Sequence, residues 1–177
     1  MSWRIDGRKA AIVVVDVQER LAAAAAGAGA ILSKIDRLLE IGRLFSLPVH
    51  FTELAPQKLG AISSSLLRSA GDGAGRYARN SLSAGAVLPK ELPQYLLIAG
   101  METHAAVRQT VYDLRERGRA VYLLADAVGS RNAVDHEVAL EEMRQDRIVV
   151  TTVEAAACEL GAEAAEPILY QLLRPLS

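Results

Sequence analysis

The feature that most constrains the fold is an alternation of short apolar runs with longer amphipathic stretches. The run from Ala10 to Val15 is apolar at every position, which is typical of a strand covered on both faces. From Ile31 to Phe45, apolar residues recur at helical spacing, and the stretch ends just before Pro48. The alternation continues, and we expect further strands at 49–52, 94–99, 120–125 and 148–151, and helices at 103–117, 134–144, 155–160 and after Pro167. The pattern predicts βαβ units and therefore a three-layer α/β/α fold with a mainly parallel central sheet, a Rossmann-like arrangement.

Length and composition describe an ordinary globular chain. The 177 residues match the usual size of one domain, so we expect a single domain over residues 1–177. Hydrophobic residues make up 51% of the chain and charged residues 23%, which supplies enough apolar surface for a core and for a subunit interface.

Charge and hydropathy narrow the range of partners. The net charge is −1, and Lys and Arg are scattered among Asp and Glu, so no basic stripe exists to neutralise the phosphates of a nucleic acid. No apolar run approaches the roughly 20 residues that span a bilayer, and the N-terminus lacks the apolar core of a signal peptide. The single cysteine, Cys158, fits a reducing compartment, and its alanine-rich surroundings predict a packed core thiol. These features predict a cytoplasmic protein that binds neither nucleic acid nor membranes.

Two segments interrupt the alternation. Residues 22–30 are only Ala and Gly and are interpreted as the start of a helix without chemistry. Residues 57–85 are expected to form a long surface loop around one short helix at 62–68. Both lie where loops of an open α/β sheet shape a pocket.

Four carboxylates are expected where predicted strands end. In open parallel sheets ligands bind outside the carboxyl ends of the strands, where helix N-termini also present free N–H groups. Asp16 follows the most apolar strand, and a carboxylate there is costly unless it is paired or functional, so we favour function for Asp16. Glu53 and Asp126 are equally well explained as caps of the following helices. Glu102 is the fourth.

Four motifs in order resemble the isochorismatase-like hydrolase family. The resemblance extends from about Lys9 to Leu173 and is closest to the small single-domain branch. The motifs are Asp16-Val17-Gln18, the segment 79–84 (Arg-Asn-Ser-Leu-Ser-Ala), the segment 100–107 (Gly-Met-Glu-Thr-His-Ala-Ala-Val) and the segment 126–131 (Asp-Ala-Val-Gly-Ser-Arg). Together with the apolar supply of the chain, the family resemblance that the motifs show leads us to expect a homo-oligomer.

The resemblance implies a modified catalytic site. The family's usual machinery is an Asp, a Lys and a Cys, whose thiolate attacks a carbonyl. By position these three fall on Asp16, Arg79 and Ala106, so only the Asp is kept. Alanine offers no nucleophile, which excludes cysteine chemistry at that position, and a guanidinium can hold an anion but cannot shuttle protons. The isochorismatases that name the family also carry a small residue at the Cys position and use their Asp as a general acid, so a missing thiol leaves another reaction open.

The resemblance also assigns the surroundings of Asp16. We expect the substrate to contact Gln18, Arg79 and the turn formed by Glu102, Thr103, His104, Ala105 and Ala106, whose backbone N–H groups can bind an oxyanion or carboxylate. A cis peptide between Met101 and Glu102 is implied as well. The nicotinamidase branch holds zinc with an Asp and two His residues, but only one His, His50, lies in the corresponding region, so we expect no metal and no cofactor.

The three histidines have different expected roles. His50 lies inside a predicted strand and is expected to be a hydrogen-bonded core or interface residue. His104 is expected either in the wall of the pocket or on the surface at the start of the helix, and His136 is expected to be solvated.

Three functions remain open from the sequence. The first is a hydrolase with a modified site, in which Asp16 and a bound water act on a small amide or enol-ether substrate. The second is a family member without catalysis that binds a small molecule or serves as an assembly or regulatory protein. The third is an unrelated activity on the same fold.

Overall fold

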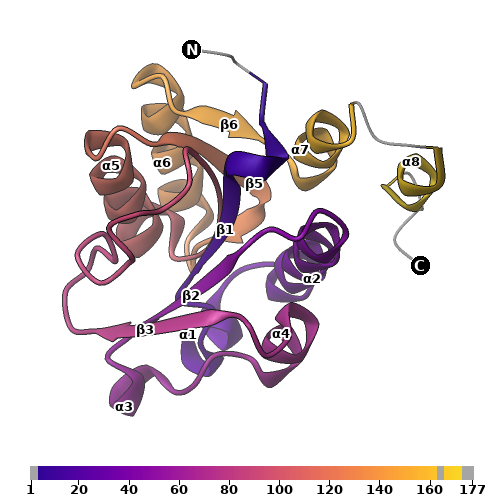
Figure 1. The fold of residues 1–177 in the computed structure, drawn as a ribbon. Helices are drawn as coiled ribbons and strands as arrows, with labels where there is room; N and C mark the ends of the chain where they lie inside the picture. Colours follow the sequence, from indigo (N-terminus) through magenta and orange to yellow (C-terminus); the bar gives the residue numbers. More distant parts are fainter. Residues whose placement is uncertain (1–3, 163–165, 173–177) are drawn as a thin grey trace.

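A six-stranded parallel sheet forms the centre of the molecule in the computed structural model, which describes residues 4–162 and 166–172 (Figure 1). The strand order is β3-β2-β1-β4-β5-β6, and every strand pair is parallel. The strands are β1 (Ala10–Val15), β2 (Val49–Leu54), β3 (Gly75–Arg79), β4 (Tyr95–Met101), β5 (Ala120–Gly129) and β6 (Val149–Thr151). Helices cover both faces of the sheet, which confirms the predicted three-layer α/β/α fold.

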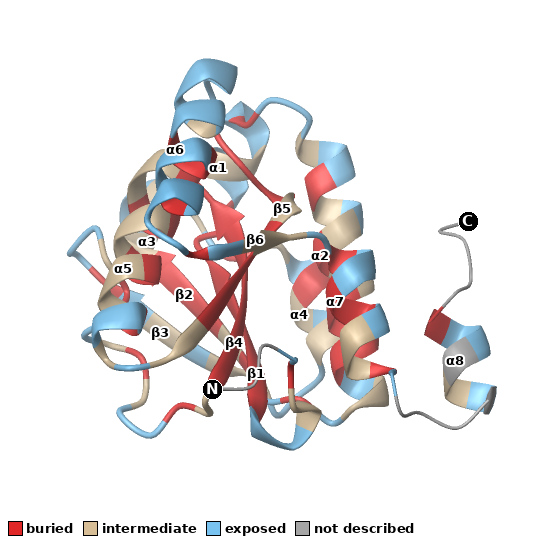
Figure 2. Cartoon of the chain, turned by 90° about the horizontal axis from the view of Figure 1, so that it is seen from above, coloured by how far each residue is buried: buried red, intermediate tan, exposed pale blue. Residues whose placement is uncertain are grey.

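Two hydrophobic clusters, one on each face, fix the helices on the sheet. Along β1, Ile12 and Val14 belong to one cluster while Val13 and Val15 belong to the other, because successive side chains of a strand point to opposite faces. None of these four side chains is exposed, and full burial of each contributes about 1.5–3 kcal/mol. Figure 2 shows this buried sheet, drawn in red, between two layers of partly exposed helices. Burial on both faces explains why β1 is apolar throughout.

The helices divide between the two faces. The first face carries α1 (Glu19–Ala24), α2 (Ala28–Leu44), α4 (Ser64–Ala70), α7 (Val153–Leu160) and α8 (Glu166–Leu172). The second face carries η2 (Thr103–Val107), α5 (Arg108–Glu116) and α6 (Ala133–Gln145). Two short elements, η1 (Gly7–Lys9) and α3 (Pro56–Leu59), lie in connections. The expected helices 103–117, 134–144 and 155–160 are therefore present, the first of them beginning with one π-helical turn.

The interval 57–85, which we expected to be loop around one helix, also contains the edge strand β3. Its burial alternates, with Arg76 and Ala78 exposed and Arg79 buried, as in a strand at the rim of a sheet. The expected strand 120–125 is also longer, because β5 continues to Gly129 past an irregularity opposite Ala99. Asp126 therefore lies inside β5 and not at its end.

The central strands approach each other closely at their carboxyl ends. Gly100 in β4 is paired with Val15 in β1 and has φ +134°, a backbone conformation that favours glycine. A Cβ atom at this position would stand 2.0 Å from the carbonyl oxygen of Val15. The close approach brings the segment after β4 beside Asp16, which follows β1.

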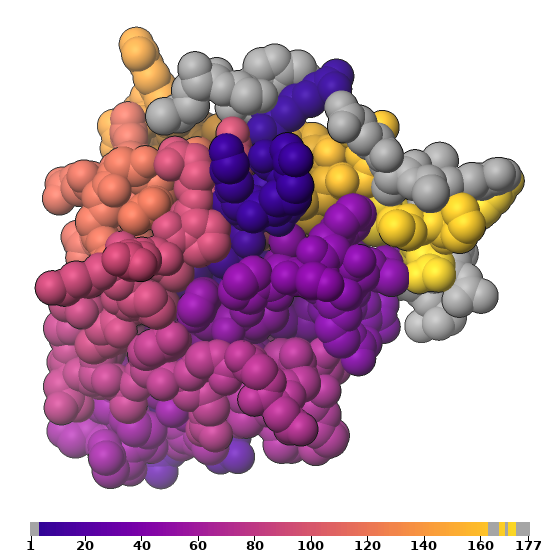
Figure 3. All heavy atoms as spheres, viewed as in Figure 1, coloured from indigo at the N-terminus to yellow at the C-terminus, as the bar shows by residue number. Residues whose placement is uncertain are grey.

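The outer strands cover β1 from the side of β3. In Figure 3 the purple and magenta segments that include β2, α4 and β3 form the lower front of the molecule, and little of the indigo β1 is visible behind them. Among the residues that the structure describes, no helix combines the length and apolar character needed to cross a membrane.

Candidate functional site

Asp16 lies at the carboxyl end of β1 and is completely buried. The residue adopts a left-handed backbone conformation with φ +52°, which Asp tolerates better than most residues, and its N–H donates to the carbonyl oxygen of Thr52 in β2. Its Oδ1 atom accepts a hydrogen bond of 2.8 Å from the hydroxyl of Thr52. Main chain and side chain of Thr52 thus fix the position of the carboxylate.

Arg79, the last residue of β3, neutralises Asp16 through two parallel hydrogen bonds. Its Nη1 atom lies 2.6 Å from Oδ1 and its Nη2 atom 2.7 Å from Oδ2, and its side chain is 1% exposed. Nη2 also donates to the carbonyl oxygen of Leu82 at 2.8 Å, whereas the buried Nε has no hydrogen-bond partner. This is the bidentate fork that guanidinium groups form with carboxylates, the strongest kind of ion-pair hydrogen bonding in proteins. Both carboxylate oxygens are therefore occupied from within the chain.

Ala106 lies in η2, on the face of the sheet that also receives Val15. It is 2% exposed and belongs to the same hydrophobic cluster as Val15, Ala84 and Val107. Apolar side chains therefore lie with Ala106 in the layer between η2 and the sheet. The N–H groups of Ala105 and Val107 both donate to the carbonyl oxygen of Glu102, so these two donors of the turn are satisfied internally.

A second polar cluster surrounds Glu102, which follows the cis peptide bond after Met101. Glu102 is 6% exposed, and its carboxylate accepts from Arg131 at 2.6 Å (Nε to Oε1) and 3.2 Å (Nη2 to Oε2). The Nδ1 atom of His104 lies 3.0 Å from the hydroxyl of Ser130, and its Nε2 atom lies 3.8 Å from Oε2 of Glu102. Arg131 and Ser130 thus attach the start of η2 to the end of β5.

Thr103 and His136 connect η2 to α6. The Thr103 hydroxyl lies 2.9 Å from Nδ1 of His136, and Thr103 is fully buried. His136, which we expected to be solvated, is half-buried, and this burial lowers the pKa of its imidazole. Sequence reasoning missed Thr52, Ser130, Arg131 and His136 as members of these networks, although Ser130 and Arg131 belong to the motif at 126–131.

The other polar residues singled out in the sequence hold the backbone. Gln18 is fully buried, and its amide donates to the carbonyl oxygens of Leu54 (3.1 Å) and Gly60 (2.7 Å) and accepts from the N–H of Leu54 (2.8 Å). Asp126 accepts from the N–H of Val153 at 2.9 Å and lies 3.4 Å from Nζ of Lys34, so it bonds the start of α7 and does not cap the next helix along the chain, α6, as we had expected. These amide and carboxylate groups are engaged by neighbouring loops and helices.

Three further residues discussed in the sequence analysis lie outside these clusters: Glu53, His50 and Cys158. Glu53 is 8% exposed and pairs with Arg76 at 3.2 Å. His50 is half-buried, with Nδ1 3.3 Å from the hydroxyl of Tyr77, as expected of a hydrogen-bonded strand residue. The expectation of a packed core thiol was wrong, because Cys158 is exposed on α7 while Ala156 and Ala157 form the buried side of that helix.

Three surface cavities among the described residues lie away from Asp16. They have volumes of about 490, 360 and 740 Å³ and are lined by α2 with α4, by α2 with Gln171, and by α5 with residues 85–90, and none includes Asp16, Arg79 or Ala106 in its lining. Within residues 4–162 and 166–172, no group of three or more His, Cys, Asp or Glu side chains is arranged to hold a metal ion.

Known proteins are similar to this chain in sequence and in fold. The chain is 32% identical over 169 residues to mouse isochorismatase domain-containing protein 2A, covering 93% of this chain and 81% of that protein. The human isochorismatase domain-containing protein 2 is 34% identical over 161 residues, which cover 88% and 77% of the two chains.

Two solved structures resemble the whole fold. One is described as MAR1 ribonuclease from Caenorhabditis elegans, with TM-score 0.89, 29% identity and coverage of 96% and 90%. The YcaC protein of Escherichia coli, described as an octameric hydrolase of unknown specificity, has TM-score 0.87, 24% identity and coverage of 97% and 90%. The family model described as the Isochorismatase domain matches residues 10–155, which is most of the chain. The chain therefore belongs to the isochorismatase domain family.

Proposed function

We propose that this chain is a family member without hydrolytic activity, which acts as an assembly or regulatory protein. One observation carries this proposal. Asp16 is completely buried, and both of its carboxylate oxygens are bonded to the guanidinium of Arg79. The residue that would be the remaining acid or base is thus held as half of an internal ion pair.

The geometry opposes each catalytic route through this position. A general acid or base must come within about 2.6–3.2 Å of the proton that it moves, either directly or through one water. Within that range Thr52 and Arg79 donate three hydrogen bonds to the carboxylate of Asp16, and arginine stays protonated, so it cannot pass a proton onward. Ala106 supplies no nucleophile, and its surroundings are apolar.

Assembly with further copies of the chain has support from the surface of α6. Val134 and Val138 are 63% and 52% exposed and stand one helical turn apart, so they present one apolar stripe to solvent. The octameric state described for the E. coli structure indicates that this fold can assemble. We propose a homo-oligomer in which such stripes are covered.

A hydrolase with a modified site is the second candidate. It is favoured by membership of the family and by the hydrolase described for the E. coli structure. In this candidate Asp16 would act with a bound water on a small amide or enol ether, and Gln18, Arg79 and residues 102–106 would hold the substrate. The ion pair of Asp16 and Arg79 would have to open before a substrate could reach the carboxylate.

A turnover assay separates the two candidates. The purified protein is incubated with a panel of small amides and enol ethers and with a short RNA, the last because one structural neighbour is described as a ribonuclease. Product is followed by mass spectrometry, and the molar mass of the protein is measured by light scattering. We expect no turnover and a mass above that of one chain. Turnover of any of these substrates by the unmodified protein would overturn the proposal.

A reconstruction of the thiol tests whether only the reactive groups are missing. Because position 106 is 2% exposed, we expect the thiol of the variant Ala106→Cys with Arg79→Lys to be alkylated by iodoacetamide much more slowly in the native protein than in urea, measured by intact mass. Because Cys158 is exposed and would react as well, the experiment uses a Cys158→Ser background. Ala106→Cys alone is the control, since it keeps the guanidinium of Arg79. Fast alkylation of the native double variant, but not of Ala106→Cys alone, would contradict this expectation and favour the hydrolase candidate.

A further inference from the structure

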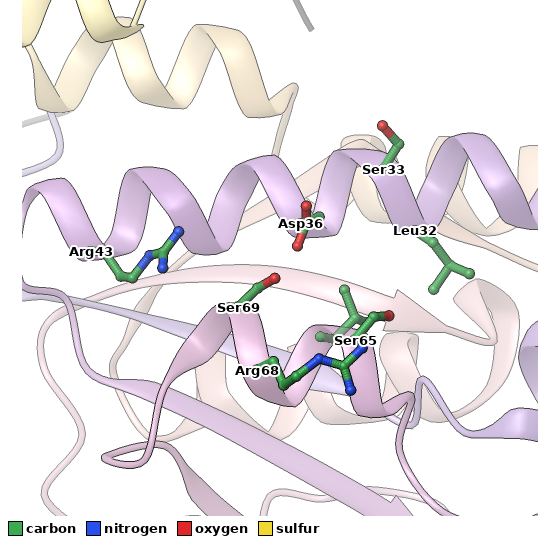
Figure 4. Close-up of a pocket in the computed structure, with 8 residues that line it drawn as sticks. Leu32, Ser33, Asp36, Arg43, Ser65, Arg68 and Ser69 are labelled. Atoms are coloured by element: carbon green, nitrogen blue, oxygen red, sulfur yellow. The ribbon is translucent and has the colours of Figure 1, made fainter. Parts of the chain in front are cut away.

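The groove between α2 and α4 contains charged side chains that the fold does not use. It has a volume of about 490 Å³, and its polar lining comes from Ser33, Asp36 and Arg43 on α2 and from Arg68 and Ser69 on α4. Figure 4 shows Asp36, Arg43 and Ser69 directed toward the gap between the two helices. We propose that this groove binds a small phosphate monoester that also carries an ammonium group.

Three of these side chains have no partner within the described chain. Arg43, Arg68 and Asp36 form no hydrogen bond or ion pair with the described residues, and neither arginine comes within 4.0 Å of the Asp36 carboxylate. By contrast Arg37, one turn after Ser33 on the same helix, is paired with Glu40 and donates to carbonyl oxygens near the end of α8. Arg43 and Arg68 are exposed and Asp36 is half-buried, so these charged groups of the groove are accessible to a ligand.

The charges define the chemistry of the ligand. Two guanidinium groups match the two negative charges of a phosphate monoester, because their planar N–H groups bind phosphate oxygens in pairs. The hydroxyl of Ser69, which Figure 4 shows directed toward α2, adds a donor that has no other partner in the described structure, whereas Ser33 points away from α4. Asp36 would repel a bare anion, so its presence favours a ligand whose cationic group pairs with the carboxylate.

The location keeps this site separate from Asp16. The groove lies on the outer surface of the first face, over the cluster that includes Ile35 and Leu66, whereas Asp16 and Arg79 are enclosed at the end of β1. The proposal uses none of the residues discussed for catalysis. Its success or failure is therefore independent of the proposed function.

The test compares three probes on the full chain by isothermal titration calorimetry at low salt. O-phosphoethanolamine carries both groups, inorganic phosphate carries only the anion, and glycerophosphoethanolamine carries the amine with a singly charged diester. We expect O-phosphoethanolamine to bind most tightly. Arg43→Gln and Arg68→Gln should each weaken its binding about threefold to fivefold, the range for a partly exposed charge pair.

The substitution Asp36→Asn gives the sharpest discrimination. We expect this substitution to weaken the binding of O-phosphoethanolamine and to strengthen the binding of inorganic phosphate, because the same carboxylate attracts the ammonium group and repels the phosphate. The matched control is Arg144→Gln, which removes an exposed arginine on α6, on the other face of the sheet, and should leave both affinities unchanged.

Several results would overturn the proposal. The first is that O-phosphoethanolamine does not bind at millimolar concentrations. The second is that Arg144→Gln weakens its binding as much as Arg43→Gln or Arg68→Gln does. The third is that Asp36→Asn changes the affinities for O-phosphoethanolamine and inorganic phosphate in the same direction. Tighter binding of the diester would also refute it, because that result points to a lipid headgroup. A change of oligomer mass in Arg43→Gln would assign the groove to subunit contacts instead.

Discussion

Removing the charge of Asp16 should destabilise the protein strongly. In Asp16→Asn the guanidinium of Arg79, whose side chain is 1% exposed, would remain buried without a counter-charge. Breaking a buried ion pair by removing one partner costs about 3–5 kcal/mol. For a chain of this size, this corresponds to a lowering of Tm by roughly 6–20 °C. Asn is the appropriate replacement because it tolerates the positive φ of this position, so the effect of charge is separated from backbone strain.

A double-mutant cycle measures the ion pair itself. We expect Asp16→Asn and Arg79→Met each to be destabilising, and the double variant to be more stable than the sum of the two losses by about 2–3 kcal/mol. The free energies come from urea unfolding followed by far-UV circular dichroism. The matched control is Glu142→Gln, which removes the same kind of charge from a pair with Arg108 of 3.0 Å on the surface. This control should cost less than about 1 kcal/mol.

Two results would contradict this expectation: a loss of unfolding free energy in Asp16→Asn no larger than in Glu142→Gln, or losses in Asp16→Asn and Arg79→Met that simply add in the double variant. Either result would show that the carboxylate and the guanidinium do not depend on each other. The catalytic candidate, which needs Asp16 to be released from Arg79, would then become the better interpretation.

Three further predictions concern other parts of the molecule. Gly100→Ala should prevent folding or lower the free energy of unfolding by more than about 4 kcal/mol, because the new Cβ would collide with the main chain of Val15. Gly27→Ala, at a positive φ with no atom within 4 Å of the new Cβ, should lower it by only about 1–2 kcal/mol. Soluble yield and Tm measure both effects. Burial lowers the pKa of His136 below its ordinary value near 6.5, so the folded state favours the neutral imidazole and the protein loses stability as the pH falls below that value. The drop in Tm from pH 7.5 to pH 5.5 should therefore be smaller in His136→Asn than in the unmodified protein. An equal drop in the two proteins would contradict this. Cys158 should react with Ellman's reagent in the native protein as fast as in urea, and protection of the thiol would contradict its exposure.

The fold was largely predictable because burial on two faces leaves a clear pattern. β1 was predicted with its observed bounds, since each of its residues faces one of the two clusters and all are apolar. β3 has neighbours on one side only, so its pattern of exposed and half-buried residues with two arginines does not resemble a strand in sequence. The end of β5 was misplaced because its pairing shifts register opposite Ala99.

The candidate site was predictable only in part. The motifs indicated that Asp16 and Arg79 belong together, and the structure brings them into contact. The role of Thr52 depends on the register between β1 and β2, which the sequence does not specify. The exposure of Cys158 depends on which side of α7 faces the sheet, and a helix composed largely of alanine gives no sign of this.

The ion pair also has a mechanical consequence for the rim of the sheet. Arg79 ends the outermost strand β3, yet its side chain extends past β2 to an acceptor that follows the central strand β1. Peeling β3 away would carry Arg79 into solvent and leave the charge of Asp16 buried without its partner, which opposes local fraying of this strand. The amide protons of β3 that pair with β2 should therefore exchange with deuterium about as slowly as those of β2, which is unusual for a strand at the border of a sheet.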